Sequence, residues 1–551
     1  MNNLPVLDLV VIAGYFAILF GIGVWAARRE KQVSSDYFLA GRDVGWLAVG
    51  ASLFASNIGS EHLVGLAGTG AASGLAVGHF EWIACFMLLL LGWLFVPFYL
   101  RSGVYTMPEF LERRFNPAAR WYFTWVSVIG YVLTKISVTL FAGGVVMRAV
   151  TGFDIWTSAT VLIVITGLYT IFGGLRAVIY TEVLQAVVLI VGSAALMFIG
   201  LSATGGWSGL EAKLPADFFS MWKPMSHPDF RWTGVVFGAP ILGVWYWCTD
   251  QHIVQRVLAA KSEEDARRGT IFAGYLKILP VFIFVLPGMI AAALYSDVRG
   301  TADSAYPTLV TRLLPAGFKG LVLAGMLAAL MSSLASAFNS CSTLLTWDVY
   351  RKLNPNASEM RLVQVGRVST IILVGLGLAW IPFMKYVSPQ LYIYLQSVQA
   401  YIAPPIAACF LLGVLIPRLN GTGAMSALIV GFVLGALRLG LELGRAHLAP
   451  GSLWMWLATI NFLHFAALLF VLSTVILVGV SLATPAPDPK QIAGLTREAK
   501  EKAPVVVRER GGLRISQARS RWQRSLACCG SFSDSPTHIQ TAVNCGCYGN
   551  G

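Results

Sequence analysis

Apolar runs of about 20 residues, separated by short polar segments, repeat along most of the chain. A run of that length matches a helix that crosses the hydrocarbon core of a bilayer. The pattern predicts about thirteen such helices. Their expected ranges are 6–27, 46–71, 79–100, 121–147, 155–173, 178–201, 233–254, 269–295, 317–347, 364–385, 391–416, 423–442 and 453–482. We therefore expect an all-α polytopic membrane protein.

The second run departs from the composition of a lipid-facing helix. Residues 50–74 read GASLFASNIGSEHLVGLAGTGAASG, a stretch rich in Gly, Ala and Ser that also carries Asn57, Glu61 and His62. Polar groups and irregular backbone are tolerated at membrane depth only where they face protein or a watery cavity. This segment is therefore expected to line an internal site.

Two runs contain signals that interrupt a helix. The second is expected to break around Ser56 to Gly59, and the seventh is expected to break at Gly238, Pro240 and Gly243. The two runs lie five helices apart, so they cross the membrane in opposite senses, as the halves of an inverted repeat do. Gly and Pro are also simply common in membrane helices. The polar groups in both runs favour a central site between two inverted repeats.

Composition and charge agree with a membrane protein. The chain has 551 residues, of which 56% are hydrophobic and only 12% are charged, and its formal net charge is +13. The basic residues form short clusters between apolar runs, so cytoplasmic loops and anionic lipid explain the charge, and we expect no nucleic-acid partner. The positive-inside rule then places the amino terminus outside and the carboxyl terminus in the cytoplasm.

The first apolar run is expected to be an uncleaved helix, because its basic cluster follows it instead of preceding it. With no glycan-bearing extracellular loop of any length in the sequence, we expect a bacterial inner membrane. After residue 483 the composition becomes rich in Pro, then basic, then rich in Cys and Gly. We expect 483–551 to be a cytoplasmic tail that is disordered or lies along anionic lipid.

The broken second run offers ligands for a hard cation. Where a helix is unwound, backbone carbonyls are free to coordinate sodium, and serine hydroxyls can complete the shell. The carbonyls of Ala55 and Ile58 and the hydroxyls of Ser332 and Ser333 form such a set. A serine inside a helix also often bonds back to a carbonyl of its own helix.

Several polar side chains fall inside apolar runs, where each is costly without a partner and is therefore a functional or pairing candidate. They are Glu81, Lys135, Glu182, Asp250, Lys277 and Gln396. Tyr246 and Trp247 add aromatic faces beside the second break. Carboxylates, amides and a lysine beside aromatic surface suit an uncharged polyol, because they offer directional hydrogen bonds to hydroxyls and a flat face for ring carbons.

Long blocks of this chain resemble the sodium/solute symporter family, and within it the sodium/glucose cotransporter branch. These blocks are GASLFASNIGS, ITGLYTIFGGLRAVIYTEVLQ, WYWCTDQHIVQR, GYLKILP, LMSSLASAFNS and LQSVQAYIAPPIAA, and the resemblance spans about residues 6–482. It implies the leucine-transporter fold. The implied parts are a first helix and cytoplasmic loop (1–45), repeat one (46–201), an extracellular loop (202–232), repeat two (233–416), two peripheral helices (417–482) and the tail (483–551).

The resemblance also implies a role for individual residues. The expected sugar contacts are Asn57, His62, Glu81, Tyr246, Trp247, Lys277 and Gln396, with Tyr246 as the inner gate beneath the sugar. The expected sodium ligands are the carbonyls of Ala55, Ile58 and Ala329 and the hydroxyls of Ser332 and Ser333.

Four positions depart from the family pattern. Gly243 stands where sugar-transporting relatives place Asn or Thr, and Glu61 replaces a small residue beside His62. Glu182 replaces an Asp at a position implicated in ion exit or a second sodium site. Ala335 lacks the hydroxyl of members that bind two sodium ions, which favours one sodium per sugar.

The resemblance implies a sodium-coupled symporter that imports a monosaccharide such as glucose or galactose by alternating access. Its transported partners are the sugar and Na+, with no organic cofactor. The sequence contains no nucleophile–base set, metal-ligand spacing or phosphate loop that would favour an enzyme. Two alternatives stay open: transport of another solute, such as inositol, a monocarboxylate or an amino acid, and a sugar sensor or leak pathway without concentrative transport.

Overall fold

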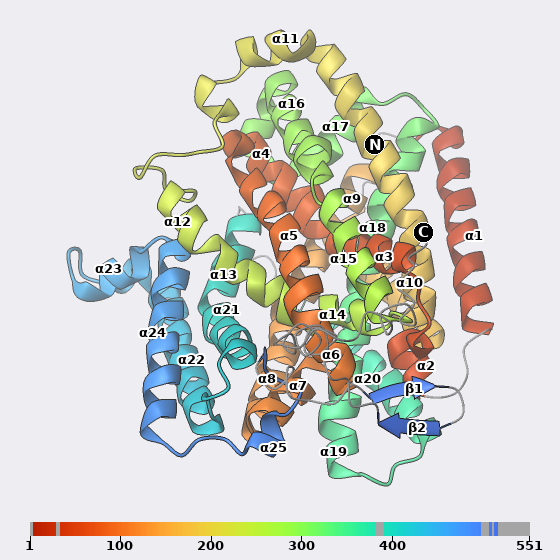
Figure 1. The fold of residues 1–551 in the computed structure, drawn as a ribbon. Coiled ribbons are helices and arrows are strands. Elements are labelled where there is room, and N and C mark those ends of the chain that lie inside the picture. Colours follow the sequence, from red (N-terminus) through yellow and green to blue (C-terminus); the bar gives the residue numbers. More distant parts are fainter. Residues whose placement is uncertain are drawn as a thin grey trace, which may run out of the picture. The chain divides into compact units, whose positions relative to one another are not determined.

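A computed structural model of the chain describes residues 4–28, 34–151, 153–380, 391–497, 506–509 and 512–515. The chain divides into two compact units, residues 1–499 and 500–551. The described part of the first unit consists of helices and their connections (Figure 1). This arrangement agrees with the expected all-α membrane protein.

The helices that precede the second expected repeat come first along the chain. They are α1 (Val6–Arg28), α2 (Ser34–Leu39), α3 (Trp46–Asn57), α4 (Ala67–Ser73), α5 (His79–Leu90), α6 (Val96–Ser102), α7 (Met107–Arg114), α8 (Pro117–Gly130), α9 (Ser137–Thr151), α10 (Ile155–Thr204) and α11 (Gly206–Lys213).

The remaining helices follow in order. They are α12 (Trp232–Phe237), α13 (Ala239–Gly243), α14 (Gln251–Leu258), α15 (Glu263–Leu276), α16 (Leu286–Leu294), α17 (Ala305–Leu313), α18 (Phe318–Leu344), α19 (Arg351–Leu353), α20 (Glu359–Trp380), α21 (Leu391–Leu415), α22 (Gly421–Leu443), α23 (Leu453–Thr459), α24 (Phe462–Ala483) and α25 (Pro489–Ile492). Short π-helical turns join several of them, including Glu61–Leu66 and Val244–Thr249.

Ten helical segments among the described residues are long and apolar enough to cross a membrane. The other three expected crossings are the two interrupted runs and a shorter apolar segment, Trp156–Gly167. A search for long unbroken apolar helices therefore does not find the two crossings that are interrupted. The last expected crossing, 453–482, is divided into α23 and α24 because Asn461 caps a new helix.

One expected loop is helical in the structure. The sequence predicts separate helices at 155–173 and 178–201, whereas α10 is continuously helical from Ile155 to Thr204. A helix tolerates glycine at a cost of about 1 kcal/mol, so the Gly173–Gly174 pair at the start of the expected loop does not have to end it. The two parts still have different neighbours, since Ile163 lies against α20 whereas Leu184 and Val188 pack with α1 and α18.

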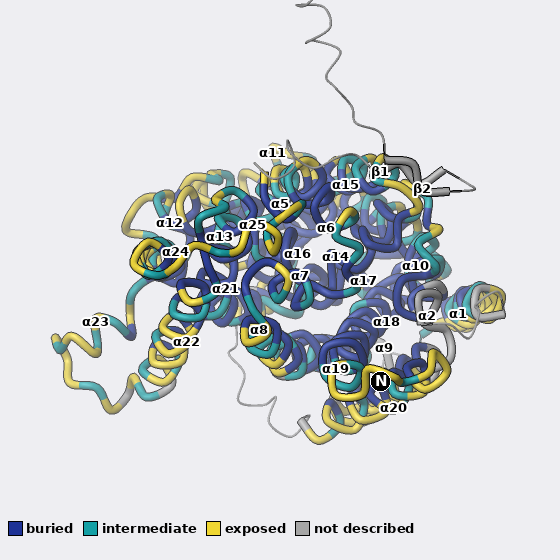
Figure 2. The backbone as a smooth tube through the Cα atoms, turned by 60° about the horizontal axis from the view of Figure 1, so that its bottom comes forward, coloured by how far each residue is buried: buried dark blue, intermediate teal, exposed yellow. Residues whose placement is uncertain are grey.

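Burial separates interior helices from those that face lipid. Of the apolar window that contains α18, 89% is buried, against 17% for α1. Figure 2 shows exposed stretches along α20, α22 and α24. Their outward side chains are large and apolar, including Ile371, Val433 and Val471. Such a surface is stable only against hydrocarbon, so the first unit is a multi-pass membrane protein.

The expected break in the second run is confirmed. Helix α3 ends at Asn57, and Ile58 adopts an extended conformation with φ −77° and ψ 100°. The chain then resumes as a π-helical turn from Glu61 to Leu66 and continues into α4. The Ile58 N–H still donates to the Phe54 carbonyl at 3.0 Å, so the regular ladder of α3 ends at this fully buried residue.

The expected break in the seventh run is correct at one position and wrong at two. The helix is interrupted at Gly238, but Pro240 lies in the first turn of α13, where its missing N–H is not needed, and Gly243 is helical. A second break lies at Asp250, with φ −70° and ψ 126°. The Asp250 side chain caps α14 by accepting a hydrogen bond from the His252 N–H.

The tail contains a short ordered element. In the second unit, β1 (Val506–Glu509) pairs antiparallel with β2 (Gly512–Ile515), and Val506 lies opposite Ile515. Within the first unit the chain beyond α24 packs against the helices, since Gln491 donates a hydrogen bond to the Phe115 carbonyl at 2.8 Å. The expected disorder of the rest of the tail concerns residues outside the described ranges and stays a prediction.

A buried arginine fastens the end of α21. The Arg114 guanidinium donates to the carbonyls of Gly413, Leu419 and Ile416 at 2.6, 2.9 and 2.9 Å. The last carbonyls of a helix have no partner within the helix, so one side chain supplies what the end of α21 lacks. Arg113, one residue earlier, is exposed and pairs with Glu109.

We expect Arg114→Met to lower the free energy of unfolding by about 3 kcal/mol, because three carbonyls lose a charged donor in a buried place. Thermal unfolding of the purified protein in detergent measures this. Arg113→Met removes the same charge at an exposed position and serves as the matched control, for which we expect a small change. Equal effects of the two substitutions would contradict the assignment.

Candidate functional site

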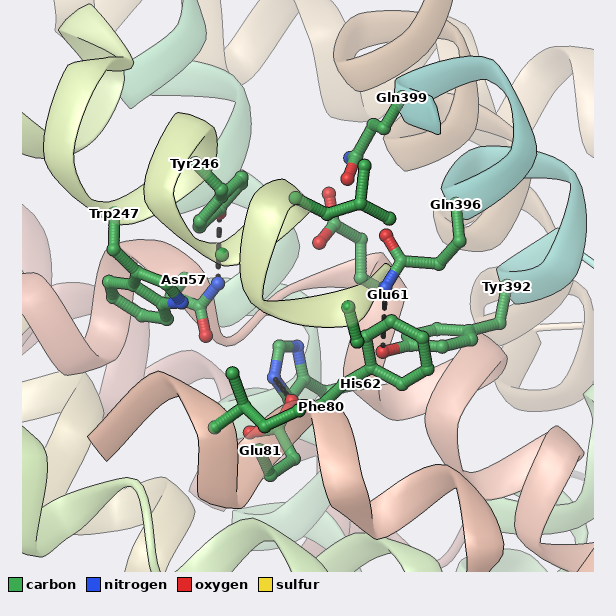
Figure 3. A pocket seen from close by; sticks show the side chains of 14 residues that line it. Asn57, Glu61, His62, Phe80, Glu81, Tyr246, Trp247, Tyr392, Gln396 and Gln399 are labelled. Atoms are coloured by element: carbon green, nitrogen blue, oxygen red, sulfur yellow. Dashed lines mark hydrogen bonds and ion pairs between the residues drawn. The ribbon is translucent and has the colours of Figure 1, made fainter. Parts of the chain in front are cut away.

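A pocket lies between the two broken segments, in the interior of the first unit (Figure 3). Its walls combine amides, carboxylates and aromatic rings. The lining residues are Asn57, Glu61, His62, Phe80, Glu81, Ile83, Ala239, Leu242, Gly243, Tyr246, Trp247, Tyr392, Gln396 and Gln399.

Four polar side chains form a buried network at one side of this pocket. The Lys277 ammonium donates to the Asn57 Oδ1 at 2.6 Å, lies 3.2 Å from the His62 Nε2 and forms an ion pair with Glu81. The His62 Nε2 lies 3.1 Å from the Glu81 Oε1. Each member comes from a different element or turn, and each is buried. The structure thus brings together four of the residues expected to bind sugar.

Two aromatic side chains of the seventh run extend the network. The Asn57 amide donates to the Tyr246 hydroxyl at 2.8 Å. The rings of Tyr246 and Trp247 meet edge to face with centroids 5.2 Å apart, and the Lys277 ammonium lies 5.4 Å from the Trp247 ring. Both residues lie on the π-helical turn that precedes Asp250, so the second break positions them.

Helix α21 supplies the facing wall. The Gln396 Nε2 donates to the Tyr392 hydroxyl at 3.2 Å, and the Tyr392 ring packs against Phe80 with centroids 5.7 Å apart. Of this wall only Gln396 is expected from the sequence. Tyr392, Gln396 and Gln399 recur at the spacing of one helix face, which is the signal that could have identified the other two.

Gly243 lies on the pocket wall where the resemblance leads one to expect Asn or Thr. A Cβ atom at Gly243 would lie 2.8 Å from the Met87 Cγ and 3.5 Å from the Ile83 Cγ2. A side chain at this position therefore needs Met87 to move. The space that an Asn or Thr side chain would need at this position is occupied by Met87 and Ile83.

The expected sodium ligands lie where the break in the second run meets α18. A Cβ atom at Gly59 would lie 2.1 Å from the Ser333 Oγ and 3.9 Å from the Ala329 carbonyl oxygen, so the two elements approach closely. Ala55 and Ile58 are fully buried beside this contact. Ser332 donates back to the Ala329 carbonyl at 3.0 Å, which is the alternative role that a helical serine can have.

Glu182 is fully buried and has three partners. Its Oε1 accepts hydrogen bonds from the Arg256 Nη2 and the Ser336 hydroxyl, both at 2.8 Å, and its Oε2 accepts one from the Ser52 hydroxyl. The carboxylate therefore ties α10 to α3, α14 and α18. This arrangement satisfies the charge without any ion.

The remaining pair of intramembrane charges lies beyond Tyr246. The Lys135 Nζ lies 3.3 Å from the Asp250 Oδ2 and 4.5 Å from the centroid of the Tyr246 ring, while the Tyr131 hydroxyl donates to Asp250. Each of these side chains thus has a partner, as a charge at membrane depth requires.

Comparison with known proteins identifies the family. Residues 37–431 match the family model described as the sodium:solute symporter family. The chain belongs to the sodium:solute symporter family. It is 41% identical over 546 residues to sodium/glucose cotransporter 4 of Danio rerio, an alignment that covers 91% of this chain and 82% of the relative. It is 42% identical over 526 residues to sodium/glucose cotransporter 1 of Oryctolagus cuniculus, with coverage of 87% and 80%.

A relative named for a different substrate is similar to this chain at nearly the same identity. The symporter chain is 40% identical over 584 residues to the sodium/myo-inositol cotransporter of Canis lupus familiaris, and the alignment covers 97% of this chain and 80% of the relative.

Two solved transporter structures have the same fold as this chain. The symporter chain matches the substrate-bound outward-open state of a Na+-coupled sialic acid symporter with a TM-score of 0.74 at 22% identity, over 88% of this chain and 99% of the other. It matches Mhp1, a nucleobase-cation-symport-1 family transporter, with a TM-score of 0.52 at 16% identity, over 83% and 97%. The leucine-transporter fold expected from the sequence is confirmed.

At the far end of the pocket wall, a loop carboxylate holds the start of α21 in this symporter. The Asp303 Oδ2 accepts a hydrogen bond from the Leu391 N–H at 3.4 Å, and a Cβ atom at Gly68 of α4 would lie 2.7 Å from the Asp303 Oδ1. Asp303 lies between two apolar spans, outside the membrane-spanning segments. Burial raises the pKa of Asp303 to about 6.

We expect Asp303→Asn to raise the free energy of unfolding at pH 7.5 by about 2 kcal/mol. Because the pKa is raised in the folded protein, the contribution of Asp303 to stability is complete below pH 3.8 and is lost as the pH rises through 6. The stabilising effect of the substitution should therefore vanish near pH 4. Thermal unfolding at both pH values measures it.

The matched control is Asp297→Asn in the same loop. The Asp297 side chain is 59% exposed and pairs with Arg312 at 2.8 Å, so its removal should not raise the unfolding midpoint. A midpoint of the Asp303→Asn protein equal to that of the wild type at pH 7.5 would show that burial does not penalise this carboxylate.

Proposed function

We propose that this protein is a sodium-coupled secondary active symporter that imports a monosaccharide by alternating access. The observation that carries the proposal is the buried network of Lys277, Glu81, His62 and Asn57, which opens on an aromatic-walled pocket beside a broken helix. The names of two vertebrate relatives, both sodium/glucose cotransporters, support it.

In this proposal the network binds sugar hydroxyls. Lys277 and Asn57 donate, Glu81 accepts, and His62 can do either, so the four side chains match groups that are both donors and acceptors. Gln396 adds an amide from the opposite wall. Tyr246 stacks beneath the ring as the inner gate, with Trp247 beside it, because the apolar face of a pyranose packs well on an aromatic ring.

Sodium is the coupled substrate. Its proposed ligands are the carbonyls of Ala55, Ile58 and Ala329 and the hydroxyls of Ser332 and Ser333. For Ser332 this requires the hydroxyl oxygen to turn its lone pairs to the ion while its hydrogen stays on the Ala329 carbonyl, which a hydroxyl can do. The close approach of Ser333 to Gly59 supports the location.

Coupling follows from the shared backbone of the break. Sodium bound between α18 and the break would hold Asn57 in place at the start of the sugar site, and would so raise sugar affinity. The reverse effect must be equal, because binding linkage is reciprocal. Loss of sodium to the cytoplasm would release Asn57 from its position and let the sugar leave past Tyr246.

The membrane potential supplies enough free energy to concentrate a sugar when one sodium ion enters with it. One charge that moves through 100 mV releases about 2.3 kcal/mol. At about 1.4 kcal/mol per tenfold, this supports a sugar gradient of about fifty-fold. We propose one sodium per sugar, because Ala335 offers no hydroxyl and Glu182 is already satisfied by Arg256, Ser336 and Ser52.

The proposed orientation follows the positive-inside rule, with the amino terminus outside and the carboxyl terminus in the cytoplasm. The bacterial inner membrane stays a prediction. Inositol transport is the second candidate, which the name of the canine relative favours. A panel of competing sugars and inositol against sodium-driven uptake into proteoliposomes separates these substrates, and a sensor or leak pathway would show no accumulation.

We expect Ser333→Ala to abolish sodium-dependent uptake in proteoliposomes, because the ion loses a hydroxyl ligand at the contact between the break and α18. Ser340→Ala is the control on the same helix: its hydroxyl is buried on α18 and has no hydrogen-bond partner among the described residues. Full sodium-dependent uptake by the Ser333→Ala protein would refute the proposed ion site.

We expect Gln396→Ala to raise the KM for sugar by about tenfold, since one neutral hydrogen bond is worth about 0.5–1.5 kcal/mol. Gln364→Ala, on the exposed face of α20, removes an amide far from any proposed role and should leave uptake kinetics as they are. Initial rates over a range of sugar concentrations measure both. Unchanged kinetics in the Gln396 variant would remove this residue from the sugar site.

A further inference from the structure

Glu61 is a charged group of the pocket that the proposed mechanism does not use. Its side chain lines the pocket and is half-buried. The other pocket carboxylate, Glu81, has both Lys277 and His62 as partners. For Glu61, in contrast, no hydrogen bond or ion pair is found within the part of the chain that the structure describes.

The charge of Glu61 therefore faces the space that a ligand fills. Lys135 interacts with Glu61 electrostatically, but the Lys135 ammonium is engaged by Asp250 at 3.3 Å and packs over the Tyr246 ring. A carboxylate at membrane depth is costly without a close partner. The protein thus leaves one anionic position of the pocket to be neutralised by whatever binds there.

The surroundings of Glu61 suit an ammonium group. In Figure 3 its side chain projects on the side of Gln396 and Gln399, whereas His62 projects toward Glu81. The Gln396 Nε2 is used by the Tyr392 hydroxyl, which leaves the Gln396 carbonyl oxygen available as an acceptor. A carboxylate, amide oxygens and nearby aromatic faces are the groups that bind an alkylammonium ion.

We propose that the pocket recognises an amino sugar, with hydroxyls on the network of Lys277 and Glu81 and a protonated amine on Glu61. The inference rests on the proposed sugar site and specifies its substrate class. A neutral sugar meets Glu61 only with a hydroxyl, whereas an ammonium group supplies both a donor and the missing charge. A hydrogen bond between charged groups is about twice as strong as one between neutral groups.

Equilibrium dialysis of the purified full-length protein tests this without transport. Radiolabelled glucose is compared with 2-amino-2-deoxyglucose, 3-amino-3-deoxyglucose and 6-amino-6-deoxyglucose in sodium chloride at pH 6.5, where the amines are protonated. We expect at least one amino sugar to bind about tenfold more tightly than glucose. If none binds more tightly than glucose, the inference is wrong.

Glu61→Gln should reduce that preference to about onefold, because the amide keeps the shape and loses the charge. Glu264→Gln is the matched control, since this glutamate is 69% exposed and pairs with Arg268 away from the pocket, and it should keep the wild-type preference. A preference that survives in the Glu61→Gln protein overturns the assignment to Glu61.

A second test uses the wild-type protein alone and changes only the pH. At pH 9 the C2 amine of 2-amino-2-deoxyglucose, whose pKa is lowered by the neighbouring C–O groups, is mostly neutral, so a wild-type preference for this sugar should largely disappear, and one that persists in full would not come from charge. Sodium-driven glucose uptake, measured in parallel, tests the symport itself. Uptake without an amino-sugar preference overturns only the role of Glu61, and the preference without uptake of any sugar overturns only the symport.

Discussion

The ion pair between Lys277 and Glu81 constrains the rest of the site. Neither charge is stable alone at membrane depth, so the two must meet, and Glu81 comes from α5 whereas Lys277 directly follows α15. Their meeting brings α5 and α15 together around α3. The Asn57 amide and the His62 imidazole complete the pair, and the pocket opens where these groups still have capacity to bind hydroxyls.

The break after Asn57 has two neighbours because of its small residues. Gly59 permits Ser333 to approach from α18, while Asn57 itself faces Tyr246 and Lys277. A larger residue at Gly59 would push α18 away. Close packing on one side and polar contacts on the other therefore depend on the same short segment, which is a physical basis for coupling two ligands.

The sequence predicts the features that carry a chemical signature. The polar break at Ser56 to Gly59 and the need of Glu81 and Lys277 for partners follow from the cost of polar groups in lipid. Which charges pair does not follow, because 196 positions separate these two. For Tyr392 and Gln399 the sequence offers only their spacing on one helix face with Gln396, and Asp250 begins α14 through a capping bond from the His252 N–H that becomes visible only in three dimensions.

Helix α21 is attached at both ends, by Asp303 at its first N–H and by Arg114 at its last carbonyls. A helix fastened in this way cannot tilt freely relative to its two anchors. The wall that carries Gln396 must then move as one rigid body with the Asp303 loop at one end and α7 at the other, or one of the two attachments must break. Opening of the pocket is thus a choice between a concerted rotation and the loss of a single identifiable bond.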